Sequence, residues 1–155
     1  MIQDIVQAGV EHASVMEALH QDGFDVPWSE QSFMDLLAQP NINGWIAGPT
    51  NPMGFILIRT AADEAEVLTL AVGASHRRQG LARSLMLYVL RSLKENAVKL
   101  WHLEVADDNG AAIALYQSLG FSESGRRAGY YLRPNGHADA VLMTKQVNDF
   151  RSTSD

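Results

Sequence analysis

The chain has 155 residues, of which 46% are hydrophobic and 19% charged, a composition typical of one globular domain with a buried core. Its formal net charge of -6 at pH 7 argues against broad electrostatic attraction to nucleic acid and favours a basic partner. The chain has no cysteine, which excludes disulfides, thiolate zinc sites and a cysteine nucleophile, and it shows neither a signal peptide nor a membrane-spanning apolar run, so we expect a cytoplasmic protein without membrane contact.

The first half of the chain predicts two helices between strands, and the second helix has a well-marked start. Ser29 is a candidate N-cap, Glu30 favours the first turn, and Trp28 and Phe33 occupy the two positions of a hydrophobic staple. This helix must end before Pro40. The expected elements are a strand over 2–6, helices over 10–20 and 30–39, and paired strands over 44–48 and 53–60.

The second half predicts a strand, a helix, a further strand and helix, and a closing hairpin. An apolar, β-branched run predicts a central strand, and at Gly80 the pattern changes to that of an amphipathic helix. Asn109 is a candidate N-cap, and Gly120 is well placed to end the same helix. The expected strands cover 65–72, 99–106, 121–132 and 138–147, and the expected helices cover 80–94 and 110–119.

This order of elements, β-α-α-β-β-β-α-β-α-β-β, predicts the fold class. We expect an α/β (α+β) domain with a mixed, mostly antiparallel sheet of about six to seven strands, flanked by about four helices. The central strand–helix–strand unit should be a right-handed crossover that pairs its two strands in parallel. The domain should cover residues 1–147, followed by a flexible C-terminal tail over 148–155.

Three arginines gather around one glycine, where the central strand passes into the amphipathic helix. Arg77, Arg78 and Arg83 surround Gly80, which lets the backbone approach a ligand closely, and Ala82 keeps the first helical turn small. The first amides of a helix lack internal acceptors and attract anions. Taken alone, the loop favours a solvated basic turn. No nucleotide-binding glycine signature is present, so phosphates would be held mainly by backbone amides.

The same loop, "RRQGLA", resembles the R/Q-x-x-G-x-G/A loop of the GNAT superfamily of N-acetyltransferases, with Arg77, Gly80 and Ala82 at the defined positions. The strand "EVLTLAV" before it and "NGAAIALYQSLGF" after the next strand strengthen the resemblance. Within the superfamily, "PWSEQSF", "LEVADDNGAAIALYQSLGF" and "GRRAGYY" with "GHADAVLM" resemble the RimI type, the ribosomal-protein-alanine N-acetyltransferases. The resemblance covers nearly the whole chain and implies a single GNAT-type domain.

The resemblance implies acetyl-CoA as co-substrate and no metal. The loop amides would bind the pyrophosphate, the backbone of the central strand would hydrogen-bond the pantetheine arm, and one asparagine would contact the coenzyme. The implied coenzyme-binding residues are Leu70, Ala71, Val72, Arg77, Arg78, Gln79, Gly80, Leu81, Ala82, Arg83 and Asn109.

A carboxylate on the strand "KLWHLEVA" is the candidate general base. Strand alternation places Trp101, Leu103 and Val105 on one face, and His102 and Glu104 on the other. The resemblance places the second face in the acceptor cleft, where Glu104 would deprotonate the amine directly or through a water. Partial desolvation raises the pKa of a carboxylate toward useful basicity. His102 is the second candidate base, and a structural carboxylate bonded to backbone or arginine is the alternative role for Glu104.

Tyr116 is the candidate general acid, one helical step beyond Ala112 and Ile113. The resemblance implies that its hydroxyl reaches the sulfur of the coenzyme, where it would protonate the leaving thiolate after a tetrahedral intermediate. The alternative is a core tyrosine whose hydroxyl is satisfied locally.

The implied acceptor is the N-terminal alanine of small-subunit ribosomal protein eighteen. Asp107 and Asp108, beside the expected cleft, would favour such a basic protein N-terminus. Alternatives are a small-molecule amine, a lysine side chain, or a non-catalytic coenzyme A-binding regulator. A nucleic-acid module would add Arg126 and Arg127 to the loop arginines, but the acidic balance argues against direct nucleic-acid binding. We expect a monomer or weak dimer.

Overall fold

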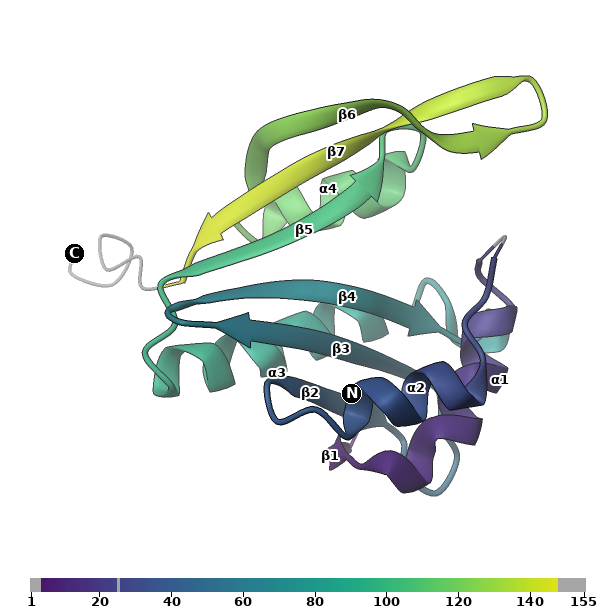
Figure 1. The fold of residues 1–155 in the computed structure, drawn as a ribbon, viewed down its shortest axis with the longest axis vertical. Coiled ribbons are helices and arrows are strands. Elements are labelled where there is room, and N and C mark those ends of the chain that lie inside the picture. Colours follow the sequence, from purple (N-terminus) through teal and green to yellow (C-terminus); the bar gives the residue numbers. More distant parts are fainter. Residues whose placement is uncertain (1–3, 25, 148–155) are drawn as a thin grey trace. The chain divides into compact units, whose positions relative to one another are not determined.

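The computed structural model describes residues 4–24 and 26–147 and contains the predicted order of strands and helices (Figure 1). The expected tail over 148–155 lies outside the described residues. The first elements are β1 (Ile5–Ala8), the 3₁₀ turn η1 (Val10–His12), α1 (Ala13–Gln21), α2 (Glu30–Leu37), β2 (Ile42–Ala47) and β3 (Gly54–Ala61). They are followed by β4 (Glu64–Val72), the 3₁₀ turn η2 (Ala74–His76), α3 (Leu81–Glu95), β5 (Leu100–Ala106), α4 (Gly110–Ser118), β6 (Ser122–Arg133) and β7 (Gly136–Gln146).

The described strands form one seven-stranded sheet in the order β1-β2-β3-β4-β5-β7-β6. The pairs β1/β2, β2/β3, β5/β7 and β6/β7 are antiparallel. β4 and β5 are parallel, with Glu64 opposite Leu100 and Glu66 opposite His102. This confirms the mixed, mostly antiparallel sheet and the parallel pairing across the α3 crossover.

Backbone contacts divide the chain into two compact units. The first contains the described residues up to Ala61 together with Val67–Ser92, and the second contains Ala62–Glu66 and the described residues from Leu93 onward. β4 therefore contributes its first residues to the second unit and the rest to the first. Each unit has its own packing.

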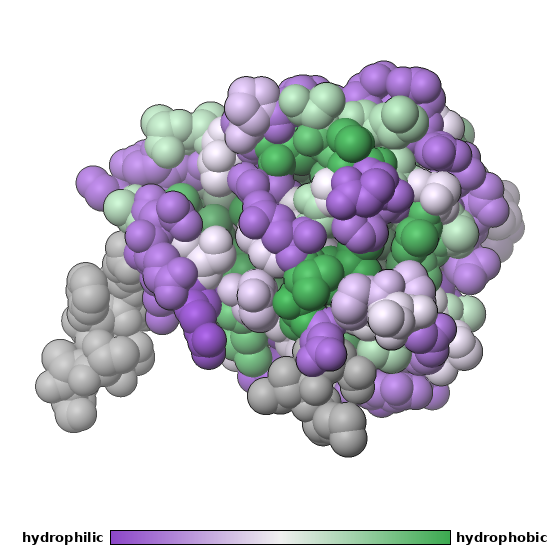
Figure 2. Space-filling model, turned by 90° about the horizontal axis from the view of Figure 1, so that it is seen from below, coloured by the Kyte–Doolittle hydropathy of each residue, from purple (hydrophilic) through white to green (hydrophobic). Residues whose placement is uncertain are grey.

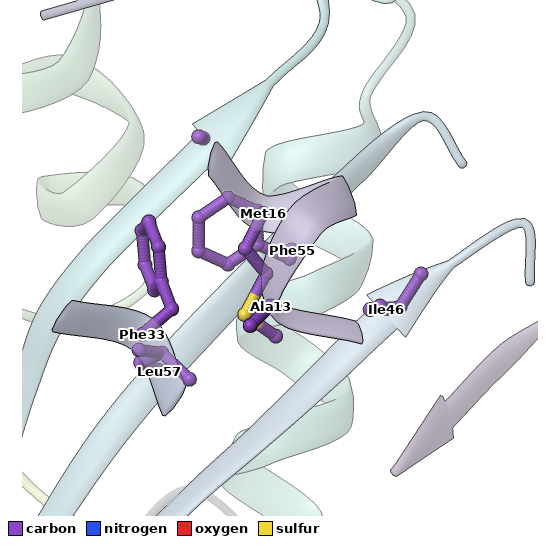
Figure 3. Close-up of a cluster of buried hydrophobic side chains, with 7 residues drawn as sticks. Ala13, Met16, Phe33, Ile46, Phe55 and Leu57 are labelled. Carbon is purple, nitrogen blue, oxygen red and sulfur yellow. The ribbon is translucent and has the colours of Figure 1, made fainter. Parts of the chain in front are cut away.

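The first unit packs α1 and α2 against β2, β3 and β4. Buried hydrophobic side chains from these elements form one cluster, shown in Figure 3. Within it, the rings of Phe33 and Phe55 meet edge to face with centroids 5.5 Å apart. Both rings are fully buried, and burial of each large apolar side chain contributes roughly 1.5–3 kcal/mol. The buried members are Ala13, Met16, Phe33, Ile46, Phe55, Leu57 and Ala71.

The start of α2 confirms the predicted cap and staple. The backbone N–H of Ser32 donates to Ser29 Oγ at 3.1 Å, which satisfies one of the free amides of the first turn. The rings of Trp28 and Phe33 lie 5.6 Å apart. The cap and the ring contact fix the direction in which the chain enters the helix.

The second unit is built on β5 and the β6–β7 hairpin. Trp101, Leu103 and Val105 are buried, which confirms the predicted alternation along β5. Phe121 follows α4 and packs on Trp101 with ring centroids 5.3 Å apart. Gly120, with φ +100°, adopts the left-handed conformation that ends α4, as predicted.

The structure differs from the prediction at the N-terminal end. Within the described residues the first strand begins at Ile5, not at Asp4, and residues 2 and 3 of the expected strand lie outside the described residues. The single helix expected over 10–20 is divided into η1 and α1. The division arises because the Gly9 amide donates to His12 Nδ1 at 3.0 Å, and the backbone at His12 has φ -94° and ψ 3°. A side-chain cap of this kind tightens the chain into a 3₁₀ turn before the regular helix.

The surface combines polar and apolar residues. Val26, Tyr130 and Leu132 expose 81%, 54% and 74% of their area, and hydrophobic side chains lie between hydrophilic ones on the face in Figure 2. None of the helices in the described part of the chain has both the length and the apolar character needed to cross a bilayer.

Candidate active site

The arginine–glycine loop, residues Arg77–Arg83, is tied to its surroundings by its first arginine. Arg77 Nε donates to the carbonyl oxygen of Val72 at 3.1 Å, and an Arg77 terminal nitrogen donates to that of Asp22 at 3.4 Å. The sequence predicts that this arginine adds charge at the rim of an anion site, and that role stays a prediction. In the structure its side chain holds the loop against the end of β4 and the residue after α1.

The backbone of the loop presents open donors. Arg78 and Gly80 have φ +64° and +79°, in the left-handed region that glycine tolerates best. Within the part of the chain that the structure describes, the amides of residues 78–82 donate to no backbone carbonyl. A Cβ added at Gly80 would meet open space. Open amides at the start of the 15-residue helix α3 form a site that suits a phosphate group.

The end of β4 leads into this loop through the 3₁₀ turn η2. Ala71 is buried, whereas Leu70 and Val72 are partly exposed. A Cβ at Gly54 in β3 would lie only 2.8 Å from the Ala71 carbonyl oxygen. Glycine at this position therefore permits the close approach of β3, which supports the strand segment predicted to bind the pantetheine arm.

Glu104 on β5 forms an ion pair that the sequence did not specify. Its Oε2 lies 2.8 Å from Nε of Arg127 on β6. An arginine partner was the alternative role considered for this carboxylate, and the partner is now identified. Among the described residues, the other carboxylate oxygen, Oε1, takes part in no hydrogen bond or ion pair. Glu104 therefore has one engaged and one open oxygen.

His102, the second candidate base, is bound on both ring nitrogens. Its Nε2 lies 2.7 Å from Glu64 Oε1, and its Nδ1 lies 2.9 Å from Thr144 Oγ1. Thr144 Oγ1 in turn lies 3.0 Å from Ser124 Oγ. This polar chain joins four strands of the second unit, so His102 has a structural role there. No group of three metal-ligating side chains is present among residues 4–24 and 26–147.

The helix α4 carries the other two predicted residues of the second unit. Asn109 Oδ1 accepts from the Ala112 amide at 3.2 Å, which confirms the predicted cap. The ring of Tyr116 packs against Phe121, with centroids 6.0 Å apart. Burial raises the pKa of Tyr116 to about 12, so it keeps its proton at neutral pH.

The two aspartates expected to attract a basic acceptor are instead paired within the chain. Asp107 Oδ2 lies 3.3 Å from Arg126, and Arg133 binds Asp108 through two nitrogens at 2.7 and 3.1 Å. The hydrogen bond from Arg133 is the main cause that lowers the pKa of Asp108. Spacing along the chain could not reveal these pairs, because the arginines lie 19 and 25 residues away.

The predicted site residues thus fall into two groups. The first unit brings together the end of β4 and the arginine–glycine loop. The second unit carries Glu104, Asn109 and Tyr116, with Arg127 on Glu104. Arg127 is the residue that sequence reasoning missed as part of the site. The segment "GRRAGYY", which contains Arg127, was the sequence feature that could have indicated this role. It carried only the family resemblance and a possible nucleic-acid patch.

A model described as the acetyltransferase (GNAT) family matches residues 13–121. The chain is 33% identical over 130 residues to the ribosomal protein bS18-alanine N-acetyltransferase of Escherichia coli (strain K12), a match that covers 84% of this chain and 88% of that protein. It is 30% identical over 144 residues to the enzyme of the same name from Haemophilus ducreyi, covering 92% and 97% of the two chains.

Solved structures agree with this relationship. The crystal structure of the ribosomal-protein-S18-alanine N-acetyltransferase from Escherichia coli superposes with a TM-score of 0.89 at 29% identity, and the match covers 94% of each chain. Arabidopsis thaliana NAA60 in complex with acetyl-CoA superposes with a TM-score of 0.78 at 22% identity, a likeness of fold. By family match, sequence identity and fold, this chain belongs to the GNAT family of acetyltransferases, is similar to its RimI-type members, and has the fold of a single GNAT domain.

Proposed function

We propose that this chain transfers the acetyl group of acetyl-CoA to the α-amine of a protein N-terminus, most specifically the N-terminal alanine of small-subunit ribosomal protein S18. The observation that carries the proposal is the 33% identity, over 84% of the chain, to an enzyme named for this acceptor. Membership of the acetyltransferase family alone would leave the acceptor open. The reaction belongs in the cytoplasm, and the absence of cysteine suits a reducing compartment.

The first unit would hold the coenzyme. The open amides of residues 78–82 and the left-handed backbone at Gly80 suit a diphosphate. Leu70, Ala71 and Val72 would bind the pantetheine arm through their backbone, and Asn109 in the second unit would add a coenzyme contact. The bound thioester supplies the acetyl group. Arg77 would act indirectly, because its side chain shapes the loop through the Val72 carbonyl.

The second unit would supply the proton transfers. An acceptor ammonium has no lone pair, so it must lose a proton before it can attack the thioester carbonyl. Glu104 would take that proton through Oε1, directly or through a water, while Oε2 stays with Arg127. Burial raises the pKa of Tyr116 to about 12, so its hydroxyl is protonated at neutral pH. It would donate a hydrogen bond to the departing thiolate, which then takes up a proton.

Three observations distinguish this proposal from the alternatives retained in the sequence analysis. A non-catalytic regulator would not need Glu104 and Tyr116, yet both are present. A nucleic-acid surface would need exposed, unpaired arginines, but Arg126 and Arg127 are both paired with carboxylates. His102 would be a poor base, because Glu64 and Thr144 occupy its two nitrogens.

Mass spectrometry on two matched peptides tests the proposal. The first is a basic peptide with a free N-terminal alanine, and the second has a blocked N-terminus and a free internal lysine. With acetyl-CoA, the protein should add one acetyl group to the first peptide alone. Acetylation of the second peptide would indicate a lysine acceptor. If both peptides stay unmodified while small amines react, the protein acceptor is wrong.

A further inference from the structure

The β6–β7 hairpin contains three arginines in three different environments. Arg126 is surrounded by three carboxylates, those of Glu123, Asp107 and Asp139, at 2.9, 3.3 and 3.2 Å. Arg133 binds Asp108 through two nitrogens. Arg127 contacts Glu104 through Nε alone. Its terminal nitrogens make no polar contact within the described residues.

The strand register places Arg127, and not Arg126, on the face of the proposed base. Glu104 lies opposite Leu142, and Ala140, two residues along the same strand, lies opposite Arg127. Paired residues of an antiparallel ladder share a face, and alternate residues of one strand share it too. Arg127 therefore reaches Glu104 across β7. Arg126 lies opposite Val141, on the other face.

A bulge in β6 fixes the position of the Arg127 guanidinium. Between Arg127 and Tyr131 the strand advances four residues, while its partners advance only two, from Ala140 to Ala138. Gly129 in this bulge has φ +62°, and its amide donates to Asp139 Oδ1 at 2.9 Å. The bulge brings the ring of Tyr130 to 5.2 Å from the centre of the Arg127 guanidinium, which is within cation–π range.

Arg127 is therefore held on two sides, by Glu104 and by the Tyr130 ring. We propose that Arg127 is the positioning residue of the general base: it holds Oε2 of Glu104 so that Oε1 faces the acceptor amine in a single orientation. This inference rests on the proposed acetyl transfer. A guanidinium stays charged throughout the working pH range, so the ion pair with Glu104 Oε2 persists across it. In this role Arg127 acts through Glu104 and not on the reacting atoms.

Steady-state kinetics of acetyl transfer to the alanine-first basic peptide test this role, with Arg127→Gln as the main variant. We expect kcat to fall by about tenfold, because a misplaced base costs rate rather than binding, while KM for the peptide and for acetyl-CoA stays within about twofold. Arg127→Lys should restore part of the rate. Lys99→Gln removes a cation that pairs with Asp63 at 3.7 Å, and it should leave kcat unchanged.

A double-variant comparison separates positioning from a structural role. In a Glu104→Gln background, Arg127→Gln should cause no further loss of kcat, because the arginine acts only through the carboxylate. The inference is overturned if Arg127→Gln lowers kcat equally in the wild-type and Glu104→Gln backgrounds. It is also overturned if Arg127→Gln alone leaves kcat unchanged or raises it. Wild-type protein that acetylates no amine would overturn the proposed function and this inference together. Wild-type activity that is insensitive to Arg127→Gln overturns the inference alone.

Discussion

His20 on α1 and Thr69 on β4 are joined by a buried hydrogen bond, with Nε2 of the imidazole 3.1 Å from Oγ1. The Trp28 amide donates to the other ring nitrogen, Nδ1, at 3.1 Å. Because an amide can only donate, Nδ1 carries no proton, and the proton lies on Nε2. The ring also stacks on Phe24 at 3.8 Å. His20 thus links the segment after α1 to the strand that leads into the arginine–glycine loop.

This arrangement predicts a loss of stability in mild acid. Burial lowers the pKa of His20 from 6.5 to about 4, so the unfolded chain binds a proton at a higher pH than the folded protein does. The stabilisation is complete above pH 6.5 and is lost as the pH falls toward 4. The loss in unfolding free energy should reach about 3 kcal/mol. Denaturant titrations at several pH values would measure it.

The His20 contribution can be isolated by difference. His20→Gln should remove this part of the pH dependence, whereas His137→Gln, at an exposed position, should retain it. If the unfolding free energies of wild type and His20→Gln fall equally steeply between pH 6.5 and 4, His20 is not the source of the acid sensitivity.

Glu104→Gln should reduce the rate of acetyl transfer by about 10²- to 10⁴-fold, the range expected on loss of a general base. KM for acetyl-CoA should change little, because the proposed coenzyme contacts lie elsewhere. The fold should persist, since an accessible ion pair stabilises a protein by at most about 1 kcal/mol. Steady-state kinetics with a thermal unfolding scan measure both effects. Glu95→Gln, at an exposed carboxylate on the end of α3, is the matched control.

Tyr116→Phe should lower kcat while leaving the helix intact, since the ring that packs on Phe121 is retained. A second expected effect concerns stability in strong base. Because burial raises the pKa of Tyr116 from 10.0 to about 12, its contribution is complete below pH 10 and is lost as the pH rises to 12. That loss should be absent from Tyr116→Phe and present in Tyr88→Phe, as measured by unfolding at alkaline pH. Identical alkaline transitions in all three proteins would contradict the burial of this hydroxyl.

Much of the fold follows from local sequence signals, because each signal acts within a few residues. The Ser29 cap, the Trp28–Phe33 staple, the Asn109 cap and the glycine that ends α4 are all confirmed. The alternation of β5 is confirmed for the same reason, since strand geometry fixes which side chains share a face. The boundaries of the 1–147 domain remain a prediction.

The pairing of charges at the candidate site could not be predicted. Glu104 and Arg127 are 23 residues apart in sequence and two strands apart in the sheet, and they meet because the registers of β5 and β6 on β7 place both side chains on one face. The periodicity of a single strand does not specify its register against a distant strand. The same long-range pairing engages Asp107 and Asp108, which sequence reasoning had assigned to the acceptor.

Gly80→Ala tests the loop as an anion site. At φ +79° an added Cβ strains the backbone by about 1–2 kcal/mol, although nothing in the described residues would clash with it. The loop should shift its amides, and KM for acetyl-CoA should rise more than kcat falls. Gly110→Ala is the matched control, since a Cβ at that helix position also meets open space. An unchanged KM for acetyl-CoA in Gly80→Ala would remove the loop from the coenzyme site.

The most direct test of the central claim is site-localised mass spectrometry of whole ribosomal protein S18. Purified S18 with a free N-terminal alanine would be incubated with acetyl-CoA and either the wild-type protein or Glu104→Gln. We expect one acetyl group on the alanine α-amine with the wild-type protein, and almost none with the variant over the same time. Acetyl groups found only on lysine side chains, or equal modification by both proteins, would contradict it.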